Sequence, residues 1–542
     1  MPTPKAPRKR IWSPKSWPRL RKVVQYLSLL AFLVLFIWSR RGGWPAEVVN
    51  LPMRLDPLAM LAHLIASRTL LAGSALALIT VGLTLLLGRV WCGWLCPLGT
   101  ILDIFSFRRL RGKRPAVPLE LGSSAGTAGS FRQSRKEPAL GDKWRRVKHV
   151  VLLTILSAAL FTNLTLLVLD PLTLLFRTLS ASVWPAVDQL VTAVETALYR
   201  GVPFMRPAVS AFDQAVRPVV LPTDPAFYRF TALYAAVLLA VVALNAIASR
   251  FWCRYLCPLG ALLGLLSKVG LVRRQVNSQC NECGACARVC PTGTIRPDKD
   301  YRSDPAECTI CLDCLAACPQ QAIDFPARLK LAEREAYDPG RRQVLAGLGA
   351  AVAGVGLFRS NILARRDHPR LIRPPGAREN DLLNKCIRCG ECSRACPTSA
   401  IQPALSEAGL EGLWTPVLVP RIGYCDYSCH NCGQVCPVQA IPHLSLPLKR
   451  QQVIGWAYID HNRCIPWTDA EPCIVCEEMC PVPEKAIVLE TAEVLTPDGR
   501  PVTVQRPHVV RERCIGCGIC EYKCPVNGEA AIRVYVPERD QA

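Results

Sequence analysis

The stretch WCGWLCPLG, residues 91–99, returns later in the chain as WCRYLCPLG, residues 252–260. Each copy places two cysteines four residues apart and a proline directly after the second cysteine. Extended to 91–106 and 252–267, the copies align without gaps and share nine identical residues of sixteen. Each copy follows a long apolar stretch, so the repeat predicts two related hairpins that each end in a cysteine pair.

Apolar segments dominate the first half of the chain. A helix needs ~20 consecutive apolar residues to cross a bilayer. Four segments come close to this length: 23–38, 69–87, 150–169 and 230–247. The sequence therefore predicts an α-helical membrane domain over 23–268, with four transmembrane helices arranged as two hairpin repeats.

The basic residues are unevenly distributed. The chain has 65 Lys and Arg against 42 Asp and Glu, a net charge of +23. The tail 1–22 holds eight basic residues and no acidic one, loop 102–149 twelve against four, and loop 171–228 four against four. Because cytoplasmic loops are enriched in Lys and Arg, we expect the tail, the first loop and both cysteine pairs on the cytoplasmic side. The expected partner of this charge is anionic membrane lipid, and no nucleic acid.

The chain holds 28 cysteines, and six runs take four each. The first two runs have the spacing C-x2-C-x2-C-x3-C-P of bacterial ferredoxins, in which the fourth cysteine ligates the other of two clusters. We therefore expect one 4Fe4S cluster on Cys280, Cys283, Cys286 and Cys318. A second cluster is expected on Cys308, Cys311, Cys314 and Cys290.

Four further runs follow in the last third of the chain. They are Cys386, Cys389, Cys392, Cys396; Cys425, Cys429, Cys432, Cys436; Cys464, Cys473, Cys476, Cys480; and Cys514, Cys517, Cys520, Cys524. A proline follows every fourth cysteine and is expected to begin a short helix, and an isoleucine shortly after it is expected to shield the cluster from water. Six runs predict six 4Fe4S clusters. This spacing disfavours zinc and structural disulfides, and no C-x2-C-H haem motif occurs.

On these motifs, residues 1 to about 330 resemble the membrane ferredoxin NapH of periplasmic nitrate reduction systems, a relative of NosR and CcoG. Residues from about 340 to 542 resemble NapG and its relative MauM, polyferredoxins with four 4Fe4S clusters behind a twin-arginine signal. The three-residue gap after Cys425 and the eight-residue gap after Cys464 carry this second match. The whole chain is thus similar to a fusion of NapH with NapG.

The resemblance implies how the four later runs exchange ligands, the first with the last and the second with the third. In the outer pair, Cys524 is expected with Cys386, Cys389 and Cys392, and Cys396 with Cys514, Cys517 and Cys520. In the inner pair, Cys480 is expected with Cys425, Cys429 and Cys432, and Cys436 with Cys464, Cys473 and Cys476.

Five parts are expected along the chain. They are a basic cytoplasmic tail (1–22), the membrane domain (23–268), a two-cluster ferredoxin domain (269–330), a linker (331–375) and a four-cluster polyferredoxin domain (376–542), both ferredoxin domains having an α+β ferredoxin-like fold. The linker contains GRRQVL at 340–345, which resembles a twin-arginine export signal; a basic loop end before a surface or buried helix is the alternative. We expect a multi-pass inner-membrane protein with the first ferredoxin domain cytoplasmic and the second extracytoplasmic.

The motifs predict an electron-transfer component rather than a stand-alone catalyst. Cluster ligands leave no free nucleophile, and no nucleotide-binding G-x-G-x-x-G is present. The resemblance implies a quinol-oxidising component that passes electrons from the quinone pool through 4Fe4S clusters to other redox proteins of a periplasmic system such as nitrate reductase. Two alternatives stay open: a methylamine-utilisation ferredoxin, and a maturation or regulatory redox protein for a periplasmic metalloenzyme, as in NosR and CcoG.

The candidate redox thiols are Cys92, Cys96, Cys253 and Cys257. Residues four apart lie on one face of a helical turn, so the four thiols are expected to converge between the quinone and the cluster of Cys280. Arg254, Arg108 and Arg109 are expected to lower the thiol pKa values. On this hypothesis the pairs gate electron entry; the alternative is that they are thiols packed at a helix end.

Overall fold

The computed structural model describes residues 16–40, 45–106, 142–217, 220–221, 226–327, parts of 345–356, 369–495 and 501–536. Arg108, Arg109 and positions 340–344 of the twin-arginine-like stretch lie outside the described residues. The expectations made for them stay predictions.

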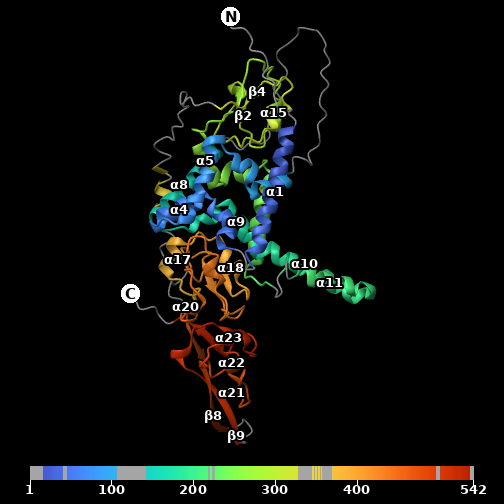
Figure 1. Ribbon diagram of the computed structural model, residues 1–542. Coiled ribbons are helices and arrows are strands. Elements are labelled where there is room, and N and C mark those ends of the chain that lie inside the picture. The colour runs from blue at the N-terminus through green and yellow to red at the C-terminus, as the bar shows by residue number, and fades with distance from the viewer. Residues whose placement is uncertain are drawn as a thin grey trace.

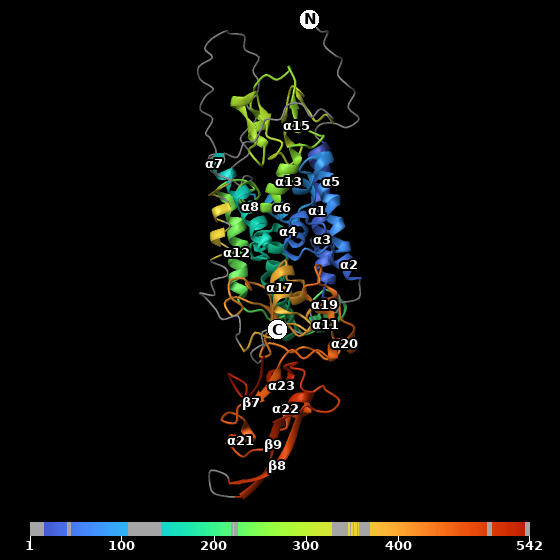
Figure 2. The same cartoon turned by 90° about the vertical axis from the view of Figure 1, so that its left-hand side faces the viewer.

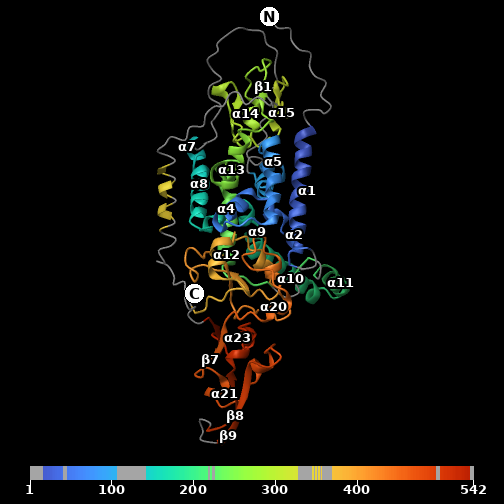
Figure 3. The same ribbon diagram turned by 60° about the vertical axis from the view of Figure 1, so that its left-hand side comes forward.

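The described residues form an elongated molecule in three parts (Figure 1). A helical domain lies in the middle, with the first ferredoxin module, residues 270–327, at one end and the second, residues 369–536, at the other (Figures 2 and 3). Helix α1 (Ser16–Trp38) contacts both modules: Arg21 pairs with Asp313 at 3.3 Å, and the Arg394 guanidinium lies 4.4 Å from the Phe36 ring centroid. Its 23 residues correspond to roughly 34 Å, so the helix bridges the distance between the modules.

Among the described residues, α1 is the one helix that is long and apolar enough to cross a membrane by itself. The other three expected spans contain shorter helices: α5 (Ala77–Leu87), α8 (Val147–Leu160) and α12 (Thr231–Ala243). Helix α8 stops because Thr162 turns left-handed, and a 3-10 turn, η4 (Thr165–Leu169), completes the segment. The four-helix membrane domain is therefore not confirmed and stays a prediction.

The two repeats are also visible in a feature that the sequence interpretation missed. Asp56 begins α4 (Pro57–Ser67) and Asp170 begins α9 (Pro171–Thr178), each as an N-cap in front of a proline. Asp56 Oδ1 accepts hydrogen bonds from the Leu58 and Ala59 N–H groups at 2.8 and 3.2 Å. Both carboxyls are fully buried, and burial together with the neighbouring Asp56 carboxyl raises the pKa of Asp170 well above its ordinary value.

The remaining elements of the helical domain are short, apart from one protruding pair. Helices α10 (Trp184–Gly201) and α11 (Arg206–Val216) extend sideways from the molecule (Figure 1). The others are α2 (Ala46–Val49), α3 (Leu51–Arg54), η1 (Ala72–Leu76), η2 (Trp91–Leu95), α6 (Pro97–Ile104), α7 (Asp142–Arg145), η5 (Leu179–Val183), η6 (Pro203–Met205), η7 (Leu244–Ala246), η8 (Trp252–Leu256) and α13 (Pro258–Ser267).

Each ferredoxin module combines short helices with two-stranded antiparallel sheets, which confirms the α+β expectation. The first module has α14 (Ala285–Val289), α15 (Asp313–Ala317), η9 (Pro297–Lys299), β1 (Gln275–Val276) paired with β4 (Ile323–Asp324), and β2 (Ile295–Arg296) paired with β3 (Arg302–Ser303).

The second module has two halves. The half next to the helical domain contains α17 (Glu379–Lys385), α18 (Glu391–Ala395), α19 (Asn431–Gln434), α20 (Leu446–Arg450) and β5 (Ile401–Pro403) paired with β6 (Pro416–Leu418). The far half contains α21 (Ile465–Thr468), α22 (Val475–Glu478), η10 (Arg511–Arg513), α23 (Ile519–Lys523), β7 (Trp456–Ile459) paired with β10 (Ile532–Tyr535), and the long hairpin β8 (Ile487–Leu495) with β9 (Pro501–Val509).

Candidate functional site

The cysteines of the first ferredoxin module form two groups. Cys290 lines one cavity together with Cys308, Cys311 and Cys314. Cys318 and Cys280 lie near Cys286 in the other group. The two runs exchange their fourth cysteines because α14 packs against α15, which is the grouping that the spacing predicts.

The second module repeats this exchange twice. Its groups are Cys386, Cys389, Cys392 with Cys436; Cys425, Cys429, Cys432 with Cys396; Cys464, Cys473, Cys476 with Cys524; and Cys514, Cys517, Cys520 with Cys480. The pairing of the first run with the last and of the second with the third is therefore wrong. Adjacent runs exchange ligands because α18 packs on α19 and α22 packs on α23.

The backbone around these cysteines is shaped to receive a cluster. In four runs, the residues two and four positions after the first cysteine have positive φ: Glu282, Gly284, Ile310, Leu312, Arg388, Gly390, Gly516 and Gly518. Such left-handed residues curl successive N–H groups toward one centre and form an anion-binding concavity. The Arg388 N–H, for example, donates to Cys386 Sγ at 3.4 Å.

The donor sets suit a cubane rather than a single ion. Within the described ranges, no three Cys, His, Asp or Glu side chains lie close enough to hold one metal ion. A cubane instead keeps each thiolate on its own iron. The six isoleucines that follow the runs are buried: Ile295, Ile323, Ile401, Ile441, Ile487 and Ile532.

The expectation that each proline begins a short helix is wrong. The short helices α14, α15, α18 and α23 end directly before the fourth cysteine, and the following prolines lie in turns or irregular backbone. The fourth cysteine has extended backbone at each of these ends, with φ −55° and ψ 124° at Cys524. It therefore leaves its own loop and reaches the neighbouring group.

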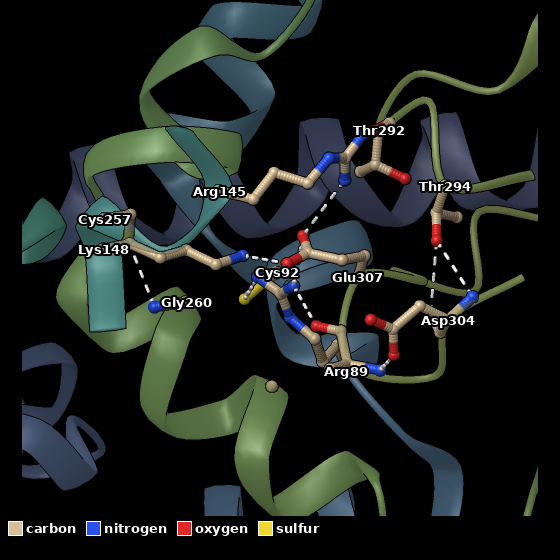
Figure 4. A network of polar contacts seen from close by, with 12 residues as sticks. Arg89, Cys92, Arg145, Lys148, Cys257, Gly260, Thr292, Thr294, Asp304 and Glu307 are labelled. Carbon is tan, nitrogen blue, oxygen red and sulfur yellow. Dashed lines mark hydrogen bonds and ion pairs between the residues drawn. The ribbon is translucent and has the colours of Figure 1, made fainter. Parts of the chain in front are cut away.

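The four thiols of the repeated motif converge, as the sequence predicts. Each motif forms one π-helical turn, η2 or η8, and its second cysteine then begins α6 or α13. Cys92, Cys96 and Cys257 are buried in one hydrophobic core, and Cys253 packs against it. The Gly260 N–H donates to Cys257 Sγ at 3.2 Å, and Arg89 Nη2 lies 4.0 Å from Cys92 Sγ (Figure 4).

The basic neighbours of these thiols differ from those expected. Arg89 and Arg250 provide the positive charge, and Arg250 Nη1 donates to the Cys92 carbonyl oxygen at 3.1 Å. Arg254 instead lies beside Gly293. Burial raises the pKa of Cys253 to about 11 and also raises the pKa of Cys96 and Cys257. The expectation of lowered pKa values is therefore wrong for these three thiols.

An ion-pair network fixes the first ferredoxin module to this site (Figure 4). Glu307 of that module forms an ion pair with Lys148, with 2.6 Å between Nζ and Oε1. Arg89 Nη1 and Arg145 Nη1 each lie 3.6 Å from Glu307 Oε2. Burial alone would raise the pKa of Glu307, but Lys148 and the two guanidinium groups lower it below its ordinary value. The carboxylate thus stays ionised and offsets part of the positive charge of Lys148, Arg89 and Arg145.

The thiol site abuts a different cysteine group from the one expected. Trp94 Nε1 donates to the Ile310 carbonyl oxygen at 2.9 Å, and a Cβ on Gly93 would collide with the Thr309 carbonyl oxygen. Both contacts involve the loop between Cys308 and Cys311. The site therefore lies next to the group of Cys308, not next to that of Cys280.

At its other end, the helical domain holds the Cys386 group. Arg177 Nη1 donates to the Arg388 carbonyl oxygen at 2.8 Å, and Arg388 Nη2 donates to Thr165 Oγ1 at 3.2 Å. Cys389 and Cys436 belong to the same continuous hydrophobic core as Cys92 and Cys257. Beyond this group, the Cys425 N–H donates to the Cys517 carbonyl oxygen at 2.8 Å, which joins the two halves of the second module.

Comparison with known proteins supports 4Fe-4S binding by these cysteines. Family models described as "4Fe-4S binding domain" match residues 69–114 with 230–277, and residues 276–296 with 507–528. Models described as "4Fe-4S dicluster domain" match residues 300–397 and 385–440. No solved structure matches.

Among the relatives, the methylamine utilization ferredoxin-type protein MauM of Methylorubrum extorquens is 37% identical over 206 residues, which is 36% of this chain and 89% of MauM. The chain belongs to the MauM and NapG family of ferredoxin-type proteins. NapG of Haemophilus influenzae is 31% identical over 216 residues, 38% of this chain and 75% of NapG. The putative electron transport protein YccM of Escherichia coli is 37% identical over 135 residues, 23% of this chain and 37% of YccM.

Membership of the MauM and NapG family establishes an iron–sulfur electron-transfer protein that binds 4Fe-4S clusters. The matches to MauM and NapG cover little more than a third of this chain. Three points stay predictions: the NapH-like character of residues 1–330, the count of six clusters and the role of the four thiols.

Proposed function

We propose that this MauM and NapG relative carries electrons from quinol along its length, through the helical domain, to a redox partner beyond the second module. The observation that carries the proposal is the succession of cysteine groups along the long axis. Two groups lie in the first module, the four thiols lie beside them, and four groups follow in the second module. When bound, the 4Fe-4S clusters supply one-electron carriers.

The helical domain is proposed to sit in the inner membrane as four spans. Helix α1 supports this, because its exposed side chains include Val23, Leu27 and Leu30, at 53%, 59% and 58% exposure. Leu78, Ile79 and Leu239 are exposed on two other helices, at 66%, 59% and 67%. Large apolar side chains exposed on several helices suit a lipid environment. The first module is then cytoplasmic and the second extracytoplasmic, as the distribution of basic residues predicts.

In this proposal the four thiols connect the first module with the helical core. Arg89 reaches both sides of the contact: it lies near Cys92 and donates to the Ala306 carbonyl oxygen at 2.5 Å. The thiols therefore lie between the Cys308 group and the core that also holds Cys389. This revises the earlier hypothesis, because the pairs would gate electrons that leave the first module rather than electrons that enter it from quinol.

The terminal acceptor is proposed to be a periplasmic reductase system such as nitrate reductase, with methylamine utilisation as the other assignment. The family relatives named MauM and NapG support both. A maturation or regulatory role is the second candidate function, favoured by the convergence of four free thiols in one buried site.

Sealed vesicles test the proposal. With the chain in the bilayer and short-chain hydroquinone supplied, membrane-impermeant ferricyanide on the side of the second module should be reduced at a rate proportional to the amount of protein. Reduction no faster than in protein-free vesicles would reject electron transfer from quinol and leave the maturation role. A reporter fused after Ala542 that stays cytoplasmic would reject the proposed topology.

A further inference from the structure

A cavity of about 540 Å³ lies where helix α1 meets the first ferredoxin module. Its walls come from α1, from the end of α6, from the segment before η8 and from both short helices of the module. Gln25, Asp103 and Arg250 are among the polar lining residues. Neither the family relationship nor the cysteine spacing assigns a role to this cavity.

The cavity touches both cysteine groups of the module. Val289 and Pro291 line it and flank Cys290, while Asp313 and Ala317 line it and directly precede Cys314 and Cys318. Cys290 and Cys314 belong to the Cys308 group, whereas Cys318 belongs with Cys280 and Cys286. The residues that line this cavity are therefore direct sequence neighbours of cysteines from both groups. A molecule in the cavity lies close to the expected ligands of two separate 4Fe-4S clusters.

A polar network fixes the inner wall. Arg250 binds Asp103 through Nε and Nη2 at 2.7 and 2.6 Å. Gln25 Nε2 donates to Asp103 at 3.0 Å and to the Gly93 carbonyl oxygen at 3.1 Å. The wall is thus connected to the backbone of the thiol motif.

Arg21 supplies a donor that the protein itself does not use. Its side chain is 6% exposed and pairs with Asp313 at 3.3 Å and with Asp103 at 3.6 Å. Its Nε atom lacks a hydrogen-bond partner within the described ranges. A buried donor without a partner carries a desolvation cost, and a ligand oxygen that reached this Nε atom would relieve that cost.

The lining charges and the mouth define the ligand. Arg21, Lys22, Arg250 and Arg288 outnumber Asp103 and Asp313, and a cationic surplus favours negative charge on a bound oxygen. Tyr26 and Ile104 are 48% and 42% exposed at the mouth, and Leu27 beside them is 59% exposed. The cavity therefore combines a polar interior with an apolar rim.

We propose that this cavity binds the head group of a hydroquinone whose apolar tail lies along α1. The inference rests on the proposed function and locates where its donor binds. Oxidation breaks the two O–H bonds of the hydroquinone; the two protons leave to solvent through the open cavity, and the two electrons would be taken up one each by the 4Fe-4S clusters that the two neighbouring cysteine groups would hold. Arg21 and Arg250 stabilise negative charge on the hydroquinone oxygen.

Two substitutions test the site in the full-length, cluster-loaded protein in nanodiscs. Ile104→Trp fills the mouth, and Leu239→Trp is the control at an exposed position of α12 that does not line the cavity. Photolabelling with a short-chain azidoquinone should modify residues 16–38 or 97–106 in the wild type and in Leu239→Trp, and excess decylubiquinone should suppress it. In Ile104→Trp, labelling and the rate of cluster reduction by decylubiquinol should both fall at least tenfold.

Arg21→Gln provides a second test that does not depend on filling space. It removes the charge and the free Nε donor, so the apparent quinone affinity in the photolabelling titration should fall about tenfold, the effect of losing one charge-assisted hydrogen bond. Iron content and reduction by dithionite should match the wild type.

The results separate this inference from the proposed function. If the wild type is labelled in the cavity but its clusters are not reduced by quinol, the cavity is still a quinone-binding site and quinol oxidation is rejected. If quinol reduces Ile104→Trp and Arg21→Gln as fast as the wild type, and the label lies elsewhere, the cavity is not the quinone site. Electron transfer from quinol would still stand. Displacement of the label by phosphatidylglycerol but not by quinone would identify a lipid site and also overturn the inference.

Discussion

Trp94 Nε1 donates a 2.9 Å hydrogen bond to the carbonyl oxygen of Ile310. This bond joins the first copy of the cysteine motif to the loop between Cys308 and Cys311. The packing of the first ferredoxin module on the helical domain therefore lies on the proposed electron path, because the two cysteine sites share this contact.

Trp94→Phe should loosen this packing. It removes the indole donor but keeps an aromatic ring, so we expect a loss of about 1 kcal/mol in the free energy of unfolding. Tyr255→Phe is the matched control, because Tyr255 occupies the equivalent position in the second copy and its hydroxyl lacks a partner among the described residues. Thermal unfolding of both variants gives the comparison, and equal stability would show that the Trp94 bond does not contribute.

Glu307 should make the packing of the first ferredoxin module on the helical domain sensitive to acid. Its pKa is lower in the folded protein than in the unfolded chain, so its stabilising effect is present above the unfolded value and is lost as the pH falls through the folded value. Glu307→Gln leaves Lys148, Arg89 and Arg145 without a counter-charge and should cost about 3 to 5 kcal/mol at neutral pH.

The control for Glu307 is Glu282→Gln, which removes an exposed carboxylate of the same module. Chemical unfolding as a function of pH is the measurement. Glu307→Gln should flatten the acid limb of the stability curve. An unchanged acid limb in Glu307→Gln would contradict this assignment.

Asp56 and Asp170 should share one proton. Two ionised carboxylates in contact and away from water would repel each other strongly. Asp170→Asn therefore replaces one partner with a neutral side chain and should retain nearly all stability, whereas Asp170→Ala loses the helix cap and about 1 to 2 kcal/mol. The infrared C=O band of a protonated carboxyl should be present in the wild type, and its absence there would show that no proton is shared.

The grouping of cysteines predicts which double substitutions have additive effects on iron content. Cys386→Ala and Cys436→Ala affect one group, so the double variant should lose no more iron than either single variant. Cys386→Ala combined with Cys524→Ala affects two groups and should lose about twice as much. Iron and sulfide analysis of protein purified without oxygen measures this, against about 24 irons expected in the wild type. The reverse pattern would restore the pairing of the first run with the last.

The sequence predicted the local cysteine sets better than their partners. Runs such as Cys308, Cys311 and Cys314 lie within a few residues of one another, so their spacing alone defines the group. Which fourth cysteine joins them depends on which helices pack together, and the sequence of the second module does not show that α18 packs on α19. The choice made by family resemblance was therefore wrong.

The repeat was predicted from its two cysteine motifs, but the buried aspartates that each begin a helix earlier in the two copies, Asp56 and Asp170, were missed. The signal was available, because Asp-Pro-Leu occurs at Asp56 and again at Asp170, well before each cysteine motif. The effect of burial on the thiols could not be predicted from neighbouring basic residues, since Arg254 is next to Cys253 in sequence but lies beside Gly293 in space. Arg89 and Arg250 were overlooked because each lies three residues before the first cysteine of its motif.

We propose that electrons pass from the first module to the second and that the four thiols gate this transfer. The most direct test is freeze-quench electron paramagnetic resonance of the Cys92→Ser, Cys253→Ser double variant in nanodiscs after mixing with decylubiquinol. We predict reduced clusters in the first module alone, with full iron content, while the wild type shows reduction in both modules. Reduction of the second module at the wild-type rate in the double variant would contradict the account.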